Sequence, residues 1–200
     1  MRKLTYALNN LGQHNQAKAI GQEALQRARK DTSFRNRGLS HFALAVTAML
    51  QGDPKEAIRQ YERAAQAMRR INHRQNLAVI CQNLGLLYDQ KGLYPQALGQ
   101  FNQALRIDRT FQEDRRSVGV DLFSVGTVYS KMKDRKTARN YYFLARQYVD
   151  PAKDLDFLIS LYTNVGFMYF QEARHDSALH YQREALALSR RLKNLATNCT

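Results

Sequence analysis

The residues from Asn83 to Ala104 read NLGLLYDQKGLYPQALGQFNQA, and this stretch decides how the rest of the chain is interpreted. Small and large apolar residues recur in it at steps of three and four, with one interruption at Lys91-Gly92. That periodicity predicts two short amphipathic helices joined by a tight turn. The small residue Gly85 would let the two helices approach closely, and the ring of Phe101 would fill the space beside it.

The same pattern occurs five times along the chain, at spacings of 40, 40, 41 and 40 residues. Its most regular feature is a pair of alanines in the second helix, at Ala17 and Ala24, Ala57 and Ala64, Ala97 and Ala104, Ala138 and Ala145, and Ala178 and Ala185. An internal repeat of this length predicts a stacked array of helix pairs. We expect a single array over residues 1–200, with repeats at about 1–31, 32–71, 72–110, 111–150 and 151–192, and a further helix or a tail at 193–200.

The copy at residues 83–104 resembles the tetratricopeptide repeat, whose signature runs Leu-Gly, Tyr, Gly, Tyr, Ala, Phe and Ala. A period near 40 alone would also suit HEAT or armadillo repeats. The fixed interval of 12 residues between the Gly85 and Ala97 positions favours the tetratricopeptide pattern. The first copy departs from it at Thr5, Leu8 and Gly21. The 40-residue form is similar to that of kinesin light chains, the LGN/Pins group and many bacterial signalling proteins.

This resemblance implies an all-α, right-handed superhelix of about five helix pairs that acts as a non-catalytic scaffold for a protein or peptide partner. It further implies that the first helix of each pair lines the concave face. The candidate partner-binding residues on that face are Phe42, Gln82, Asn83, Phe123, Ser124, Thr127, Lys131, Thr163, Asn164 and Phe167.

Asn83 and Asn164 occupy the same position in their repeats, where an amide offers a donor and an acceptor to a peptide backbone. The alternative is that both simply face water. The phenylalanines are candidate apolar anchors, because aromatic residues supply much of the binding energy at interfaces. The alternative for each of them is packing against a neighbouring helix.

The formal net charge is +14. A basic edge is predicted where the junctions between pairs carry clustered arginines, at Arg69, Arg70, Arg74, Arg106, Arg109, Arg115 and Arg116. Such an edge could bind phosphates with a steep salt dependence. Solvated helix ends are the alternative, because cations offset the helix dipole there. The fourth junction breaks the series with Asp150, Asp154 and Asp156, and nucleic acid is not the favoured partner.

The sequence shows no glycine-rich phosphate loop, nucleophile motif or metal-ligand spacing, so we expect neither catalysis nor a cofactor. We also expect no membrane span, since no stretch approaches about 18 apolar residues. The start of the chain lacks the apolar run of a signal peptide, which predicts a cytoplasmic location.

Asp150-Pro151 is predicted to end one helix and begin the next.

An uncapped last repeat would expose an apolar face and allow dimerisation. Three hypotheses therefore remain. The first is a scaffold that binds a peptide or helix and serves as a sensor or regulatory module of a larger signalling protein. The second is a self-association module, and the third is a binder of nucleic acid or anionic surfaces.

Overall fold

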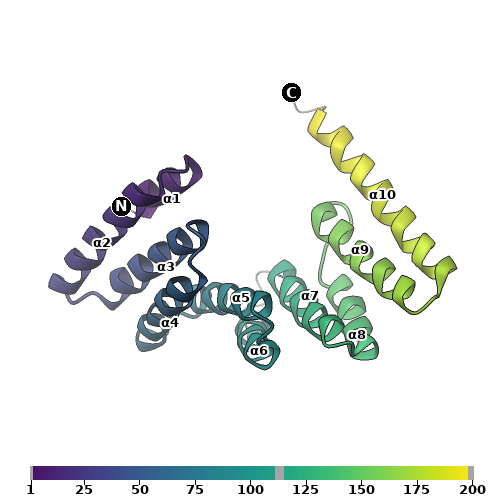
Figure 1. The fold of residues 1–200 in the computed structure, drawn as a ribbon, viewed down its shortest axis with the longest axis horizontal. Helices are drawn as coiled ribbons and strands as arrows, with labels where there is room; N and C mark the ends of the chain where they lie inside the picture. Colours follow the sequence, from purple (N-terminus) through teal and green to yellow (C-terminus); the bar gives the residue numbers. More distant parts are fainter. Residues whose placement is uncertain (1, 111–114, 198–200) are drawn as a thin grey trace. The chain divides into compact units, whose positions relative to one another are not determined.

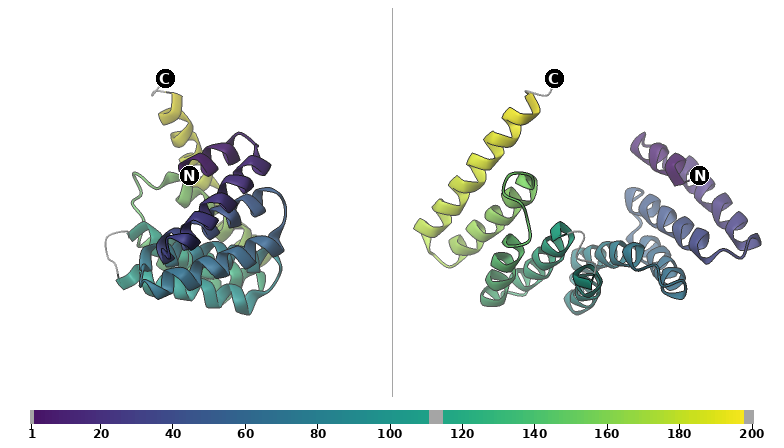
Figure 2. Two further views of the ribbon diagram at one scale, coloured as in Figure 1. Left: turned by 90° about the vertical axis from the view of Figure 1, so that its left-hand side faces the viewer. Right: turned by 180° about the vertical axis from the view of Figure 1, so that it is seen from behind.

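The computed structural model describes residues 2–110 and 115–197, and within these ranges the chain consists of ten α-helices without a strand (Figure 1). The helices are α1 (Arg2–Asn10), α2 (His14–Lys30), α3 (Phe34–Leu50), α4 (Pro54–Arg70), α5 (Arg74–Gln90), α6 (Tyr94–Thr110), α7 (Arg115–Lys131), α8 (Arg135–Arg146), α9 (Leu155–Gln171) and α10 (His175–Thr197). Consecutive helices form antiparallel pairs (Figure 2). The predicted all-α fold is confirmed. The chain divides into two compact units, residues 1–107 and 108–200.

The turn inside each pair uses one residue with positive φ. Gly12, Gly52 and Gly92 supply it in the first three pairs, where glycine avoids the steric cost of this conformation. Lys133 and Ala173 adopt the same conformation in the fourth and fifth pairs, with φ of 65° and 56°. The turn is therefore kept even where the glycine is lost.

Side-chain caps start several of the helices. Asp53 accepts a hydrogen bond from the backbone N–H of Glu56 at 3.0 Å, and Pro54 follows at the first helical position. Asp134 accepts in the same way from Thr137 at 3.1 Å. These bonds satisfy backbone N–H groups that have no partner within the helix.

The repeated alanines form the contact between the two helices of each pair. Nine of the ten are buried, and Ala24 is half-buried. Beside them, Tyr61, Phe101 and Tyr142 are at most 1% exposed. A Cβ atom on Gly85 would lie 2.6 Å from the ring of Phe101, so this glycine allows the close approach of α5 and α6.

The first pair replaces this aromatic with Gly21, which is buried against Leu44 of the following pair. A Cβ atom on Gly21 would lie 2.8 Å from Cδ2 of Leu44. The first copy thus departs from the repeat pattern at a buried glycine that lies against a leucine of α3.

The prediction that Asp150-Pro151 begins a helix is wrong. Helix α8 ends at Arg146 and α9 begins only at Leu155. Between them, Asp150 accepts from the N–H of Ala152 at 2.9 Å, and its own N–H donates to Asp154 at 2.8 Å. These local bonds favour a turn over a helical start.

For residues 193–200 we expected the start of a further helix or a tail. Residues 193–197 continue α10, and residues 198–200 lie outside the described ranges. The stretch from Ser189 to Thr197 contains no glycine or proline to end the helix. None of the described helices combines the length and apolar character that a membrane crossing requires.

Candidate functional site

A hollow with a mostly apolar lining lies between α1 and α3, the first helices of the first two pairs. Its volume is about 510 Å³. The lining residues are Lys3, Thr5, Tyr6, Asn9, Phe42, Ala43 and Val46. Among the lining residues that the structure describes, Lys3 alone is charged, so the pocket suits an apolar group with a polar or acidic neighbour at its rim.

The polar floor of this pocket is already satisfied within the protein. The amide nitrogen of Asn9 donates to Oγ1 of Thr47 at 3.0 Å, and that hydroxyl donates to the carbonyl of Ala43 at 3.0 Å. Asn9 and Thr47 are both buried. Because these groups have partners, the floor is held in place and does not require a polar ligand.

Aromatic side chains form two parts of the pocket. Phe42 is half-buried and packs edge-on against Tyr61, with ring centroids 5.5 Å apart. Tyr6 is 67% exposed and stands at the rim. The predicted anchor Phe42 therefore packs against a neighbouring helix and also lines a pocket. The two alternatives for this residue, an apolar anchor and a packing residue, do not exclude each other.

Three further pocket residues come from the first repeat and are not among the candidates predicted from the sequence. Lys3, Tyr6 and Asn9 stand two residues before, one after and four after Thr5, the equivalent of Gly85. These are the same relative positions as Asn83, Leu86 and Asp89 in the third repeat. Counting from the Gly85 equivalent could therefore have found these three residues. The weak match of the first copy to the repeat pattern concealed them.

Several of the predicted polar partner-binding side chains donate a hydrogen bond within their own helix. The amide nitrogen of Asn83 donates to the carbonyl of Val79 at 2.8 Å. The hydroxyls of Ser124, Thr127 and Thr163 donate to the carbonyl four residues earlier, at 2.7 to 2.9 Å. Short polar side chains in helices commonly bond in this way. A partner would have to share or displace these bonds.

The remaining predicted residues differ in exposure. Phe123 is half-buried between the rings of Tyr142 and Phe157, with centroids 5.5 and 5.4 Å away. Phe167 is 54% exposed, and Lys131 and Thr163 are exposed as well. Gln82 and Asn164 are half-buried. Of Phe123 and Phe167, the latter is thus the one available for contact with a partner.

The arginines of the predicted basic edge in the first unit have local contacts. Arg69 donates to Oε1 of Gln103 at 3.2 Å, and Arg74 donates to Oδ1 of Asn72 at 3.1 Å. The guanidinium of Arg70 lies over the ring of Phe34, 5.0 Å from its centroid. Arg106, at the end of α6, is exposed. Arg69 therefore links α4 to α6 of the following pair, Arg70 packs on α3 of its own pair, and Arg74 contacts the turn before α5.

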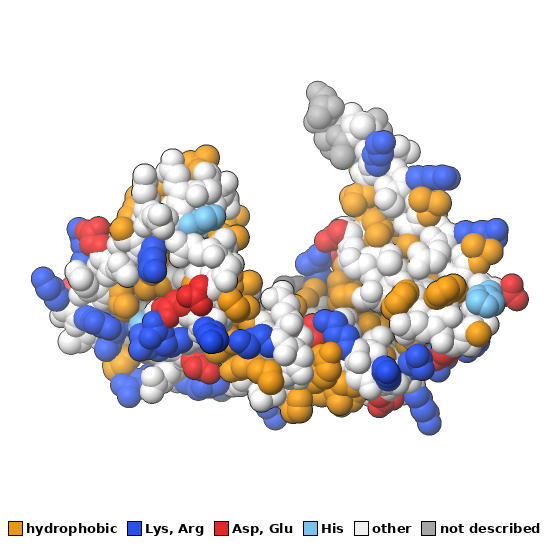
Figure 3. All heavy atoms as spheres, in the orientation of Figure 1, with side chains coloured by type: hydrophobic (Ala, Val, Ile, Leu, Met, Phe, Trp, Pro, Cys, Tyr) orange, Lys and Arg blue, Asp and Glu red, His pale blue; other side chains and the backbone are white. Residues whose placement is uncertain are grey.

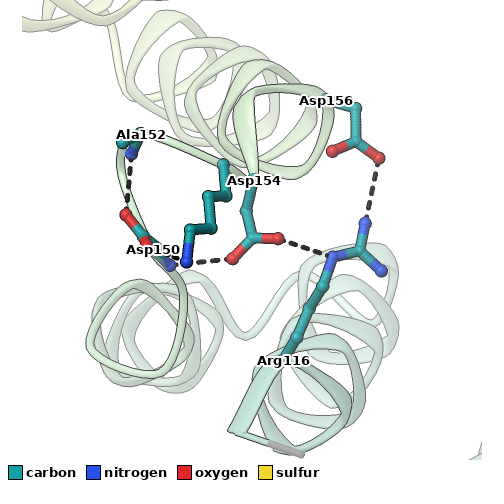
Figure 4. Close-up of polar contacts among 6 residues, drawn as sticks. Arg116, Asp150, Ala152, Asp154 and Asp156 are labelled. Atoms are coloured by element: carbon teal, nitrogen blue, oxygen red, sulfur yellow. Dashed lines mark hydrogen bonds and ion pairs between the residues drawn. The ribbon is translucent and has the colours of Figure 1, made fainter.

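Arg116 is tied to the acidic residues of the following junction (Figure 4). Its Nε atom lies 2.8 Å from Asp154, and its guanidinium also reaches Asp156 at 2.9 Å. Its neighbour Arg115 donates to the carbonyl of Gln147 at 3.0 Å, and Arg109 is exposed at the end of α6. The aspartates that interrupt the basic series thus neutralise part of it.

The positive charge of the chain is concentrated in the first unit. Residues 1–107 hold 16 Lys and Arg against 6 Asp and Glu, whereas residues 108–200 hold 15 against 11. Lys and Arg make up most of the charged surface on the face seen in Figure 3. Within the described residues, no three His, Cys, Asp or Glu side chains converge as metal ligands.

Comparison with protein families places the chain in the tetratricopeptide-repeat family. Profiles described as tetratricopeptide repeat match residues 36–110 and residues 158–192, which together make up more than half of the chain. The chain belongs to this family, and the predicted class of tetratricopeptide-like helix pairs is confirmed. No curated protein sequence matches the chain.

Solved structures share this fold at low sequence identity. BtubC from P. vanneervenii matches with a TM-score of 0.85 at 20% identity, over 95% of this chain and 78% of BtubC. Kinesin light chain repeats from P. anserina match with a TM-score of 0.76 at 12% identity, over 96% and 94% of the two chains. The apo form of the quorum sensor NprR from B. thuringiensis matches with a TM-score of 0.75 at 17% identity, over 94% of this chain and 52% of NprR.

Proposed function

We propose that the chain is a non-catalytic interaction module that binds a peptide or a helix of another protein on the surface formed by the first helices of its pairs. The observation that carries this proposal is the pocket between α1 and α3, where Tyr6, Phe42 and Val46 present apolar surface at positions that line the binding face in related repeats. A pocket of this size accepts a large apolar side chain.

Family membership supports this function, because tetratricopeptide arrays are interaction scaffolds rather than enzymes. The likeness to the quorum sensor NprR is consistent with a regulatory role. We therefore propose a sensor or regulatory module of a larger signalling protein. Asn83 and Asn164 remain proposed contacts to the partner backbone, with the bond from Asn83 to Val79 as a competing interaction.

Site-specific photo-cross-linking in the host tests the pocket. A benzophenone amino acid would replace Tyr6 in one variant and Leu11 in a matched control. Both positions are strongly exposed, but only Tyr6 lines the pocket. We expect a discrete partner adduct from position 6 that is absent from position 11.

A second substitution, Val46→Arg, would fill the pocket, and circular dichroism would verify that the helices are retained. We expect the position 6 adduct to disappear in this background. An adduct that persists with the pocket filled, or that forms equally from position 11, would contradict the proposed site.

A further inference from the structure

The second unit carries a stripe of exposed leucines and basic residues on α10. Leu179, Arg183, Leu186, Arg190 and Lys193 follow one another at steps of four and three, which places them on one face of the helix. All five are exposed, with Leu179 at 50% and Leu186 at 52%. Hydrophobic and basic side chains alternate along α10 in the space-filling view (Figure 3).

The repeat itself shows what kind of structure covers such a face. The positions equivalent to Leu186 in the first three pairs are Leu25, Ala65 and Leu105, which are 9%, 1% and 6% exposed. In the first two pairs, the second helix packs against the first helix of the following pair, α2 on α3 and α4 on α5.

Two local observations identify the contact. Leu25 of α2 and Leu44 of α3 line the same small cavity. Ala65 of α4 belongs to one apolar cluster with Leu77 and Ile80 of α5. The position of Leu186 on α10 is therefore one that, in the first two pairs, lies against the first helix of the following pair.

The charges on the stripe indicate the chemistry of the helix that it receives. Arg183, Arg190 and Lys193 flank the two leucines, and the nearest acidic residue on the same face is Asp176, at the start of the helix. A second copy of α10 would bring the same cations against one another, which is unfavourable. An acidic helix would instead offer carboxylates to the arginines and apolar side chains to the leucines.

We propose that the stripe Leu179–Lys193 is a docking surface for an acidic amphipathic helix of a partner protein, which would lie on α10 as α3 lies on α2. This site is separate from the pocket between α1 and α3, because it is built from residues of the other unit.

Two synthetic peptides provide the probes. Each has about 18 residues, or five helical turns, with leucines at helical spacing; glutamates flank the leucines in one peptide and lysines in the other. We expect fluorescence anisotropy to show that the glutamate peptide binds the wild-type chain more tightly than the lysine peptide. Leu186→Ser should weaken binding about tenfold, as expected for the loss of a buried leucine contact.

Adjacent arginines supply a matched control for the charge. Arg190 lies on the stripe, whereas Arg191 is about 100° further around the helix, and both are exposed. We expect Arg190→Glu to weaken binding of the glutamate peptide by about fivefold or more and Arg191→Glu to leave it unchanged. The double variant Arg183→Glu/Arg190→Glu should reverse the preference and bind the lysine peptide more tightly.

Several results would overturn the proposal. One is equal binding of the two peptides, or no binding, by a chain whose circular dichroism shows intact helices. Another is an unchanged affinity in Leu186→Ser, since the interaction would then be electrostatic alone. Light scattering that shows a dimer lost in Leu186→Ser would assign the stripe to a second copy. Binding of anionic vesicles or nucleic acid in place of the peptides would assign it to those surfaces.

Discussion

Nδ1 of His41 lies 2.6 Å from Oε1 of Gln60, in the buried interface between α3 and α4. The same position is Cys81, Leu122 and Tyr162 in the next three pairs, so a titratable ring here stands where the third and fourth pairs have an apolar side chain. The amide nitrogen of Gln60 donates to Glu56 at 2.6 Å. Since Oε1 of Gln60 can only accept, Nδ1 of His41 carries the proton of the neutral ring.

Acidification should destabilise the first unit through His41. Burial lowers the pKa of His41 below its ordinary value of 6.5, and the nearby cations Arg63, Arg29 and Arg37 lower this pKa further, while the bond to Gln60 opposes the shift. The unfolded chain therefore binds this proton more readily than the folded chain. The stabilising contribution is fully present above pH 6.5 and is lost as the pH falls through the lowered pKa.

Chemical denaturation of wild type and His41→Leu from pH 8 to pH 5 measures this effect. Leucine fills the same position in the fourth pair, and the other four histidines remain in both proteins. We expect the free energy of unfolding to fall more steeply below pH 6.5 in the wild type than in the variant. Parallel pH profiles would show that His41 does not titrate between the folded and unfolded states.

Gly85→Ala should destabilise the third pair by about 1 to 3 kcal/mol, as overpacking does in well-packed cores. The new Cβ would lie 2.6 to 2.8 Å from ring atoms of Phe101, which is only 1% exposed. Gly99→Ala in α6 is the matched control, because nothing lies within 4 Å of its Cβ position. Alanine there should stabilise by about 0.5 to 1 kcal/mol through helix propensity. Thermal unfolding of both variants measures these changes. Equal shifts of the unfolding temperature with the same sign would contradict the packing argument.

Ala173→Gly should stabilise the last pair by about 0.5 to 1 kcal/mol, because alanine at φ of 56° carries a steric cost that glycine avoids. The reverse change, Gly52→Ala at φ of 75°, should destabilise by about 1 kcal/mol. No atom lies within 4 Å of a Cβ on Gly52, so the backbone conformation alone accounts for this effect. Urea midpoints measure both changes, and a stabilised Gly52→Ala would refute the account.

The sequence predicted the features that repeat and missed those that occur once. The alanines and the turn at Lys91-Gly92 each follow from a local rule, and the structure reproduces them. The junction at Asp150-Pro151 was misread, because the bond from the N–H of Asp150 to Asp154 depends on how the turn folds back.

Prediction of the site was limited for a related reason. Phe42 was found by its position in the repeat, but the pocket also needs α1, whose copy of the motif is the weakest. The hydroxyls and the amide that were predicted to meet a partner instead bond to their own helix, as Asn83 does with Val79. Sequence spacing predicts the helix face on which a side chain lies, but not which acceptor its hydrogen-bond donor will meet.

Asp154 should matter more than Asp156 to the stability of the second unit, although both contact Arg116. The side chain of Asp154 is 14% exposed and also accepts the N–H of Asp150, whereas that of Asp156 is 65% exposed. Asp154→Asn should therefore cost about 1 to 2 kcal/mol, and Asp156→Asn less than about 0.5 kcal/mol, as is usual for exposed ion pairs. Double-mutant cycles with Arg116→Ala, followed by urea unfolding, separate the ion pair from the backbone bond. Because the bond to the N–H of Asp150 does not involve Arg116, part of the Asp154→Asn cost should persist in the Arg116→Ala background. Complete loss of that cost in the background would mean that Asp154 acts through the arginine alone.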